Sequence, residues 1–358
     1  MARECAKHDG MKIAVKRRTV LQGGLALGAL QVASPFLSKA NAADVVTLRM
    51  HTHVPPVSGS YKNLKWWTEK VEKDSKGRLN IQLFGSMQLG GKPPDVYDQV
   101  KNGVVDIGWT LPGYKAGLFP VTSAFELPFI GAPAHIVSPA IDAFVKKYGT
   151  KEWSAVHPIE FHSAGLSQLH MKSHKIEKLE DFKGMKIRTP SRLSSAALKA
   201  LGATPVPIPS LKMTEALMHD LVDGVVTPWS IALAIRTIDV TKYHTETTLH
   251  EPTFALIMNK DSYAKLPPDL QKVIDANSGE WLAKEFGRRW EHDDQPGIAK
   301  AKKQGDEIIK VSDAEQDRWR KVTQPVYDSW IKDLDGKGYD GKHLVEEAQR
   351  LVAKYKAA

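Results

Sequence analysis

The chain of 358 residues has a single cysteine, Cys5, and no long apolar run after its first 42 residues. Cys5 falls within residues 1–42, which have the layout of an export signal, so the remaining protein can form no disulfide bond and no thiolate metal site. After residue 42 no apolar stretch approaches the roughly 18–20 residues that a membrane-spanning helix needs. These absences predict a soluble product without covalent cross-links.

The common catalytic signatures are also absent. The chain has no phosphate-binding loop, no Gly-x-Gly-x-x-Gly, no His-Glu-x-x-His and no Gly-x-Ser-x-Gly motif. Carboxylate pairs could be assembled by chance from 41 acidic residues, so their spacing singles none out. The sequence therefore predicts a protein that holds a ligand without reacting with it, and that carries no cofactor.

Residues 1–42 combine a basic start, a Gly/Ala/Leu-rich stretch and the small-residue triplet Ala40-Asn41-Ala42, as export signals do. The pair Arg17-Arg18 followed by Thr19-Val20-Leu21 resembles a twin-arginine signal; an ordinary secretory signal with two incidental arginines is the alternative. Removing the segment leaves 43 basic and 39 acidic side chains and no long basic run, which argues against nucleic-acid binding. We expect a periplasmic protein.

Two parts of the chain alternate between strand and helix periodicity in the same order. The expected strands are 45–52, 78–84, 104–110, 184–190, 203–209 and 222–229, and the expected helices between them are 61–77, 93–103, 191–202 and 210–221. Strand–helix–strand–helix–strand order predicts a parallel sheet with right-handed crossovers. We therefore expect two similarly built α/β lobes.

After residue 260 the apolar residues follow one another at steps of three and four, which predicts helices. Trp281, Phe286 and Trp290 lie along one such track. Aromatic residues at this spacing belong far more often to a core than to a ligand site, so we expect them to clamp the two lobes together.

The strand expected at 184–190, with the sequence GMKIRTP, ends in an arginine. Pro190 prevents this strand from continuing in the centre of a sheet. Arg188 could be held for an anion, or it could form a surface ion pair with a neighbour such as Glu180 or Asp181, and geometry alone leaves both open.

Polar and aromatic side chains stand at the other strand ends, where open parallel sheets bind their ligands. Besides Arg188 these ends carry His51, His53, Trp109, Thr110, Thr189, Thr227 and Trp229. A guanidinium and aromatic rings suit a small organic acid, because the cation binds the carboxylate and the rings cover the carbon skeleton. For the two histidines, a metal pair, a ligand hydrogen bond and an ordinary strand end are all open, and no further metal ligands are evident.

Seven segments, in this order, resemble the solute-binding proteins of TRAP transporters, which are periplasmic receptors that feed organic acids to an ion-gradient-driven membrane carrier. The segments are 78–91, 100–114, 119–129, 179–190, 201–209, 221–229 and 253–274. The resemblance implies two lobes, joined by crossing strands and a long helix, that close on the ligand. It also places Arg188, in LEDFKGMKIRTP, where the family has its carboxylate-binding arginine.

The resemblance further implies a division of the chain and a set of partners. Lobe I would comprise 43–165 with about 252–290, and lobe II 166–251 with about 291–358. The partners would be a small carboxylate and TRAP-type permease subunits, with the receptor a monomer or dimer.

The departures from the family pattern concern the choice of ligand. Gln168, with His170 nearby, stands where binders of more polar acids often have a second arginine, and Thr227-Pro228-Trp229 stands where many members have an asparagine. Pro209-Ser210 replaces the usual Pro-Phe. With HTHVPP and WTLPGY, the pattern resembles the branch that binds aromatic or otherwise apolar monocarboxylates.

We therefore expect an aromatic, 2-oxo or hydroxy monocarboxylate as the ligand, with Trp109 and Trp229 closing over it. The expected site residues are Arg188, Trp109, Trp229, Thr227, Gln168, His53, His51, His170 and Tyr114. A four-carbon dicarboxylate is the alternative ligand, and a metal that bridges the carboxylate through His51, His53 or Glu126 is a further one. The rival functions are an exported enzyme with a bound cofactor and a sensory receptor.

Overall fold

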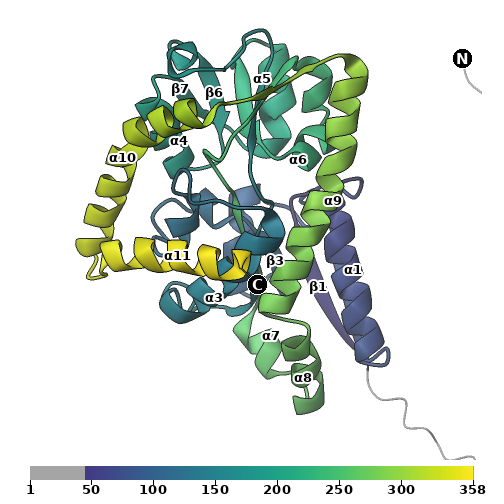
Figure 1. The fold of residues 1–358 in the computed structure, drawn as a ribbon. Helices are drawn as coiled ribbons and strands as arrows, with labels where there is room; N and C mark the ends of the chain where they lie inside the picture. The colour runs from purple at the N-terminus through teal and green to yellow at the C-terminus, as the bar shows by residue number, and fades with distance from the viewer. Residues whose placement is uncertain (1–44, 358) are drawn as a thin grey trace, which may run out of the picture. The chain divides into compact units, whose positions relative to one another are not determined.

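The computed structural model of the protein describes residues 45–357, so the export signal expected at 1–42 lies outside the described residues. Two mixed sheets organise this part of the chain, one in the lower and one in the upper half of Figure 1. None of its helices combines the length and apolar character needed to cross a membrane. The expected two-lobe α/β architecture is confirmed.

The first sheet has the strand order β2-β1-β3-β10-β4. Its strands are β1 (Val46–Thr52), β2 (Leu79–Phe84), β3 (Ile107–Thr110), β4 (His157–Ser163) and β10 (Thr253–Met258). β1 pairs in parallel with β2 and β3, whereas β10 runs antiparallel to β3 and β4. Helices α1 (Gly59–Asp74) and α2 (Val96–Lys101) make the two crossovers, as the periodicity predicts.

The second sheet has the order β11-β9-β5-β8-β6-β7. Its strands are β5 (Gln168–Met171), β6 (Lys186–Thr189), β7 (Thr204–Pro207), β8 (Gly224–Thr227), β9 (Tyr243–Glu246) and β11 (Glu307–Lys310). β6 lies between β7 and β8 in parallel, as β1 lies between β2 and β3, so the two lobes repeat one pattern. The proline-containing β7 is at the sheet edge, where missing amide hydrogens cost no ladder bond.

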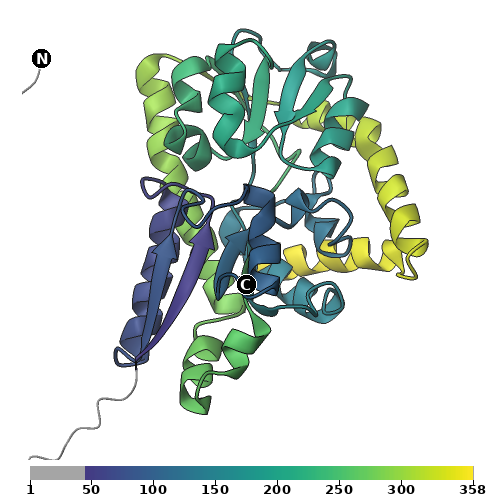
Figure 2. The same ribbon diagram turned by 180° about the vertical axis from the view of Figure 1, so that it is seen from behind.

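The remaining helices connect and cover the sheets (Figures 1 and 2). They are α3 (Ala134–Tyr148), α4 (Arg192–Ala200), α5 (Met213–Met218), α6 (Trp229–Ala234), α7 (Lys260–Ala264), α8 (Pro268–Ala276), α9 (Glu280–Gln304), α10 (Asp313–Asp335) and α11 (Gly341–Lys356). Six short 3-10 turns complete them: η1 (Pro93–Asp95), η2 (Pro112–Tyr114), η3 (Thr122–Glu126), η4 (Leu179–Phe182), η5 (Ser210–Lys212) and η6 (Thr237–Val240). The N-terminus of α4 is capped by Ser191, whose hydroxyl accepts from the amide of Ser194.

The long helix α9 runs beside both halves in Figure 1 and joins them. Phe286 and Trp290 are buried in the core of the first sheet, and Ala301 is buried with Trp229 of α6. Gly297 permits this close approach, because a Cβ there would lie 2.9 Å from the Trp229 carbonyl oxygen. Trp281 is 41% exposed, so its predicted place in the core is wrong.

The C-terminal segment also connects the lobes. In α10, Trp319 packs against Phe182 of the second lobe, whereas Trp330 belongs to the buried cluster around α3. The expected division places 291–358 in lobe II, but α11 packs in that same cluster with α3 of the first lobe. Residues 307–310, which lie between the two segments with helical periodicity, form the edge strand β11. The rest of the division stays a prediction.

Candidate ligand-binding site

A cavity lined by residues of both lobes lies between the two sheets. The first lobe lines it with residues at and beyond the ends of β1 and β3 and on β10: His53, Val54, Trp109, Leu111, Tyr114 and Phe254. The second lobe lines it with residues of β6, β8 and α6: Arg188, Pro190, Val226, Thr227, Pro228 and Ile231. Parallel strands thus direct their carboxyl ends to the cavity, as expected.

Arg188 lies in the cavity wall with 3% of its surface exposed. Its Nε donates to the carbonyl oxygen of Ile208 at 2.6 Å, and its Nη1 donates to that of Val226 at 3.1 Å. These bonds fix the plane of the guanidinium and leave Nη2 without a protein acceptor among the described residues. Burial lowers the pKa of Arg188 to about 10, which still leaves it charged at neutral pH.

The ion-pair alternative for Arg188 is wrong. Glu180 pairs with Arg318, and Asp181 accepts from the backbone amides of Glu177 and Lys178. Among the residues that the structure describes, no carboxylate lies within 4.0 Å of the Arg188 guanidinium. A buried cation without a protein anion is unfavourable until an anionic ligand arrives.

Four buried polar atoms of the lining also have no hydrogen-bond partner in the described part of the chain. They are His53 Nδ1, Trp109 Nε1, Tyr114 Oη and Ser167 Oγ. A buried polar group without a partner costs about 1–3 kcal/mol, so native structures rarely leave one unexplained. Their gathering around one cavity, beside Arg188, indicates a ligand with polar atoms of its own.

Trp109 lines the cavity and stacks on two neighbouring rings. Its indole stacks on Phe254, with the ring centroids 4.3 Å apart, and on His53, with the centroids 5.4 Å apart. These neighbours occupy the ring faces, which leaves the Nε1–H edge available to a ligand. Trp109 lines the cavity, and its contact with a ligand stays a prediction.

Trp229, the second expected aromatic cover, lies outside the cavity. Its ring packs against His170 and His244, with both centroid distances 4.7 Å, in the cluster that joins α6 to α9. Trp229 begins α6, and this helical turn directs the side chain away from the cavity and toward α9. Trp229 therefore does not line this cavity, and its contact with a ligand stays a prediction.

Three other expected site residues stand behind the cavity wall and do not line it. His51 Nδ1 lies 2.7 Å from Gln99 Oε1, and its Nε2 accepts from the Leu89 amide at 3.3 Å. Gln168 donates to the Leu166 carbonyl oxygen and accepts from the Thr247 amide.

The third, His170, lies 3.1 Å from the Thr227 carbonyl oxygen through Nε2. The structure therefore brings together five of the nine expected residues: His53, Trp109, Tyr114, Arg188 and Thr227.

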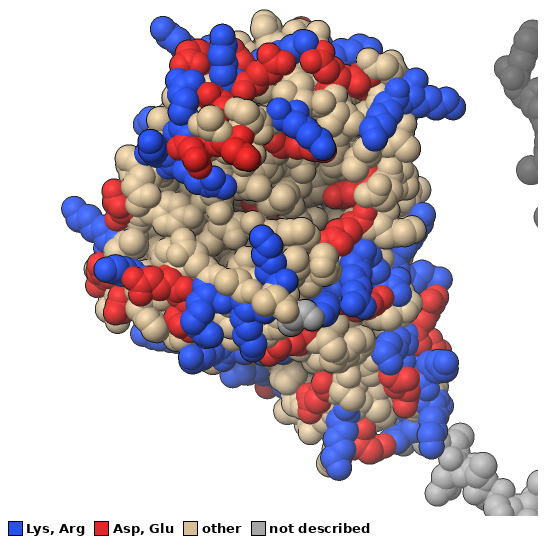
Figure 3. Space-filling view, viewed as in Figure 1, with Lys and Arg blue, Asp and Glu red and all other residues tan. Residues whose placement is uncertain are grey.

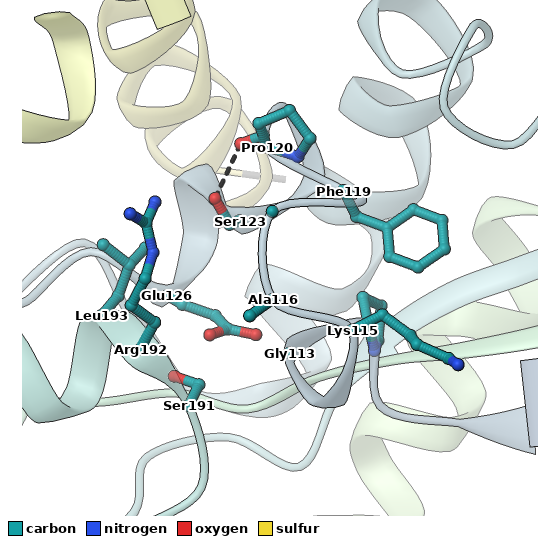
Figure 4. A pocket seen from close by; sticks show the side chains of 12 residues that line it. Gly113, Lys115, Ala116, Phe119, Pro120, Ser123, Glu126, Ser191, Arg192 and Leu193 are labelled. Carbon is teal, nitrogen blue, oxygen red and sulfur yellow. Dashed lines mark hydrogen bonds between the residues drawn. The ribbon is translucent and has the colours of Figure 1, made fainter. Parts of the chain in front are cut away.

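The carboxyl group of Glu126 lies in a second hollow next to this site, shown in Figure 4. There it points toward Ser191 at the start of α4, and burial raises the pKa of Glu126 to about 7 although Ser191 opposes the shift. His51 and His53 line no part of this hollow. The described residues contain no group of three or more side chains placed to hold a metal ion.

Several lining residues carried no recognisable signal in the sequence. Phe254 lies in the wholly apolar strand β10, whose pattern does not show which residue faces a cavity. Ser167 and Pro252 lie in the two segments that cross between the sheets, which have no periodicity. The face seen in Figure 3 is hollowed and mostly uncharged between the two halves, with charged side chains gathered around the hollow.

Comparison with known proteins shows the family to which the chain belongs. Residues 50–333 match the family model of the bacterial extracellular solute-binding proteins, family 7. A TRAP solute binding protein from Rhodoferax ferrireducens, solved with copurified benzoate, is 36% identical; the match covers 87% of this chain and 99% of that one, with a TM-score of 0.85.

Two further solved structures are similar over most of the chain. A marine metagenome TRAP solute binding protein, specific for aromatic acid ligands and solved with 3-hydroxybenzoate, is 35% identical with a TM-score of 0.85 and coverages of 87% and 99%. One from Bordetella bronchiseptica, with bound mandelate, is 26% identical with a TM-score of 0.80 and coverages of 86% and 99%. The chain thus belongs to family 7 of the bacterial extracellular solute-binding proteins, which are receptors and not enzymes.

Proposed function

We propose that this protein is an extracytoplasmic receptor that binds an aromatic monocarboxylate in the Arg188 cavity and delivers it to an ion-gradient-driven TRAP-type carrier. The observation that carries the proposal is the buried Arg188 guanidinium, which has no carboxylate partner in the described chain and faces a cavity. A carboxylate on Nη2 would complete its hydrogen bonds and balance its charge. The expected export signal would bring the receptor to the periplasm.

The charge of the lining favours one carboxylate over two. Arg188 is the one lysine or arginine among the described residues that line the cavity. The second carboxylate of a four-carbon diacid would enter an enclosed site without a cation, and burying an unpaired charge is costly. This argues against the dicarboxylate alternative.

The apolar part of the lining favours an aromatic ring as the rest of the ligand. Leu111, Val226, Ile231 and Phe254 present hydrocarbon to the cavity, as the lining of small-molecule sites usually does. Two of the similar solved proteins hold benzoate and 3-hydroxybenzoate.

Binding by closure of the lobes follows from the two sides of the site. The ligand would reach Arg188 and Thr227 in the second lobe, and His53, Trp109 and Tyr114 of the first lobe would then close over it and exclude water. A micromolar dissociation constant corresponds to about −8 kcal/mol, which one charge-assisted pair, a buried ring and a few hydrogen bonds can supply.

A thermal-shift screen of residues 43–358 against a panel of carboxylates tests the proposal. Ligand at about 100 times its dissociation constant adds about 2.7 kcal/mol to the free energy of unfolding. We expect benzoate and its hydroxylated forms to raise the melting temperature more than succinate does. A shift with dicarboxylates alone would keep a receptor and reject the aromatic ligand, and no shift with any acid would reject both.

The unpartnered Trp109 N–H makes a separate prediction about ligand choice. A hydroxyl or oxo group on the ring of the acid can accept from it, so Trp109→Phe should weaken binding of the best hydroxylated acid about tenfold, close to the value of one hydrogen bond. Benzoate should lose less than about threefold. Calorimetric titration of both acids measures the difference.

Trp229→Phe is the matched control, because this indole lies outside the cavity. It should change the two affinities by the same factor. Equal losses for both acids in Trp109→Phe would show that the N–H does not select between them.

A further inference from the structure

A chain of buried polar contacts crosses the second sheet behind the Thr227 wall of the cavity. His170 and His244 are directly paired across β5 and β9, and their Nδ1 atoms lie 2.8 Å apart. His170 Nε2 lies 3.1 Å from the Thr227 carbonyl oxygen, and His244 Nε2 lies 3.4 Å from Asp306 Oδ2. The side chains of His170, His244 and Asp306 are fully buried.

The two ends of this row of contacts are the Thr227 carbonyl oxygen and the Asp306 carboxylate. With Asp306 ionised, they fix the number of protons on the two imidazole rings. A backbone carbonyl oxygen can only accept, so His170 Nε2 must carry a proton. An ionised carboxylate can only accept, so His244 Nε2 must carry one too. The two Nδ1 atoms need one further proton between them. Three protons on two imidazole rings amount to one positive charge, whichever ring holds the shared proton.

With Asp306 ionised, two neutral rings would not satisfy the same contacts. They carry two protons, so at least one of the three contacts would bring lone pairs together where water cannot intervene. Asp306 would also remain a buried carboxylate whose nearest other contacts are Gln304 Nε2 at 3.3 Å and the largely exposed Lys242, with Nζ at 3.7 Å. An imidazolium beside Asp306 makes the buried group neutral as a whole.

Asp306 lies next to His244, so His244 is the ring whose positive charge would have a partner. Burial lowers the pKa of His170 to about 3. Burial lowers the pKa of His244 as well, against the hydrogen bond and the negative charge of Asp306, so the extra proton rests on the geometry of the three contacts and not on this shift. Two charged side chains face the pair: Asp306, which directly precedes β11, and Lys242, which contacts Asp306. Trp229 of α6 packs against both rings.

We propose that His170 and His244 share three protons, balanced by Asp306, and act as positioning residues for the ligand cavity. They act through β8. On one side the Val226 carbonyl accepts from Arg188, and on the other the Thr227 carbonyl accepts from His170, so the end of this strand is held from both neighbours. Thr227 and Pro228 then present a fixed wall to the ligand.

Nitrogen NMR of histidine-labelled protein counts these protons directly, since a ring nitrogen without a proton resonates far from one that carries a proton. Signals of the pair are assigned by their loss in His170→Gln and His244→Gln. At neutral pH we expect one unprotonated nitrogen in the pair, and two in Asp306→Asn, whose amide can donate to a neutral His244. Asp239→Asn is the control, because it changes a surface carboxylate that pairs with Lys300 and Arg236. In this variant the histidine pair should keep one unprotonated nitrogen.

The positioning role has its own readout. His244→Phe keeps a ring of similar size but cannot donate to His170, and we expect it to weaken benzoate binding about tenfold. This part rests on the proposed function, whereas the proton count is measured without ligand and does not. Two unprotonated nitrogens in the unaltered protein would overturn the shared-proton proposal, and wild-type benzoate affinity in His244→Phe would overturn the positioning role.

Discussion

Replacing Arg188 with alanine should lower the affinity for benzoate at least about 100-fold, which corresponds to about 2.8 kcal/mol. The reason is that Arg188 supplies the one cation in the described lining of the cavity, and the ligand carboxylate would be buried without it. Calorimetric titration of the purified variant measures the loss. The melting temperature without ligand must be measured alongside, because Arg188 also holds the carbonyl groups of Ile208 and Val226.

Two further variants separate the charge of Arg188 from its shape. Arg188→Lys keeps a cation but cannot make the same planar set of hydrogen bonds, so we expect an intermediate loss of about tenfold. Arg350→Ala removes a surface arginine that pairs with Glu347 on α11, and it should leave affinity within about twofold. Benzoate binding of ordinary strength in Arg188→Ala would show that the carboxylate lies elsewhere.

Local patterns were enough to predict most elements of the two sheets. Residues 45–52 and 184–190 alternate as strands do, and an amphipathic helix follows each of them. This order predicts a strand–helix–strand unit from the local sequence alone. Ser191 as a helix cap and Arg188 at a strand end could also be predicted, because both depend on residues close by in the chain. The edge strand β11 could not be predicted, because its four residues lie between two long helices and are too few to show a periodicity of their own.

The side chains that complete the site depend on contacts between distant segments. Trp229 follows a strand end, as Trp109 does, but the chain turns into α6 at this residue and packs the indole toward α9. Phe254 reaches the cavity because β10 returns from the second lobe to pair with β3. Neither fact is contained in the local sequence, so a prediction from strand ends includes Trp229 and omits Phe254.

The segment that leads into β10 carries a second buried ionisable group, Glu251. Its carboxyl group is buried, with 1% of the residue exposed, near the Ser163 side chain and the Ala132 backbone, which oppose the effect of burial without cancelling it. Burial raises the pKa of Glu251 to about 8. The neighbouring His250 offers no positive charge, because burial and the charge of Arg188 lower its pKa to about 3.

This raised pKa links stability to pH with a defined sign. Between the ordinary value of 4.5 and about 8, the folded protein keeps a proton that the unfolded chain has released. The free energy of unfolding must therefore fall as the pH rises through this window, and above it the ionised carboxylate destabilises the fold in full. Other buried carboxyl groups such as Asp294 contribute in the same direction, so only a comparison with a variant isolates Glu251.

Glu251→Gln provides that comparison, because the amide has the shape of the protonated acid and does not ionise. We expect the variant to have nearly the stability of the unaltered protein at pH 5 and to exceed it by at least about 2 kcal/mol at pH 8.5, in denaturant unfolding at both pH values. Glu72→Gln, at an exposed site on α1, should have the same free energy of unfolding as the unaltered protein at both pH values. If Glu251→Gln lost stability with pH as steeply as the unaltered protein, the ionisation of Glu251 would not be coupled to folding, and its carboxyl group would have to be paired with a water or ligand in the crossing segment.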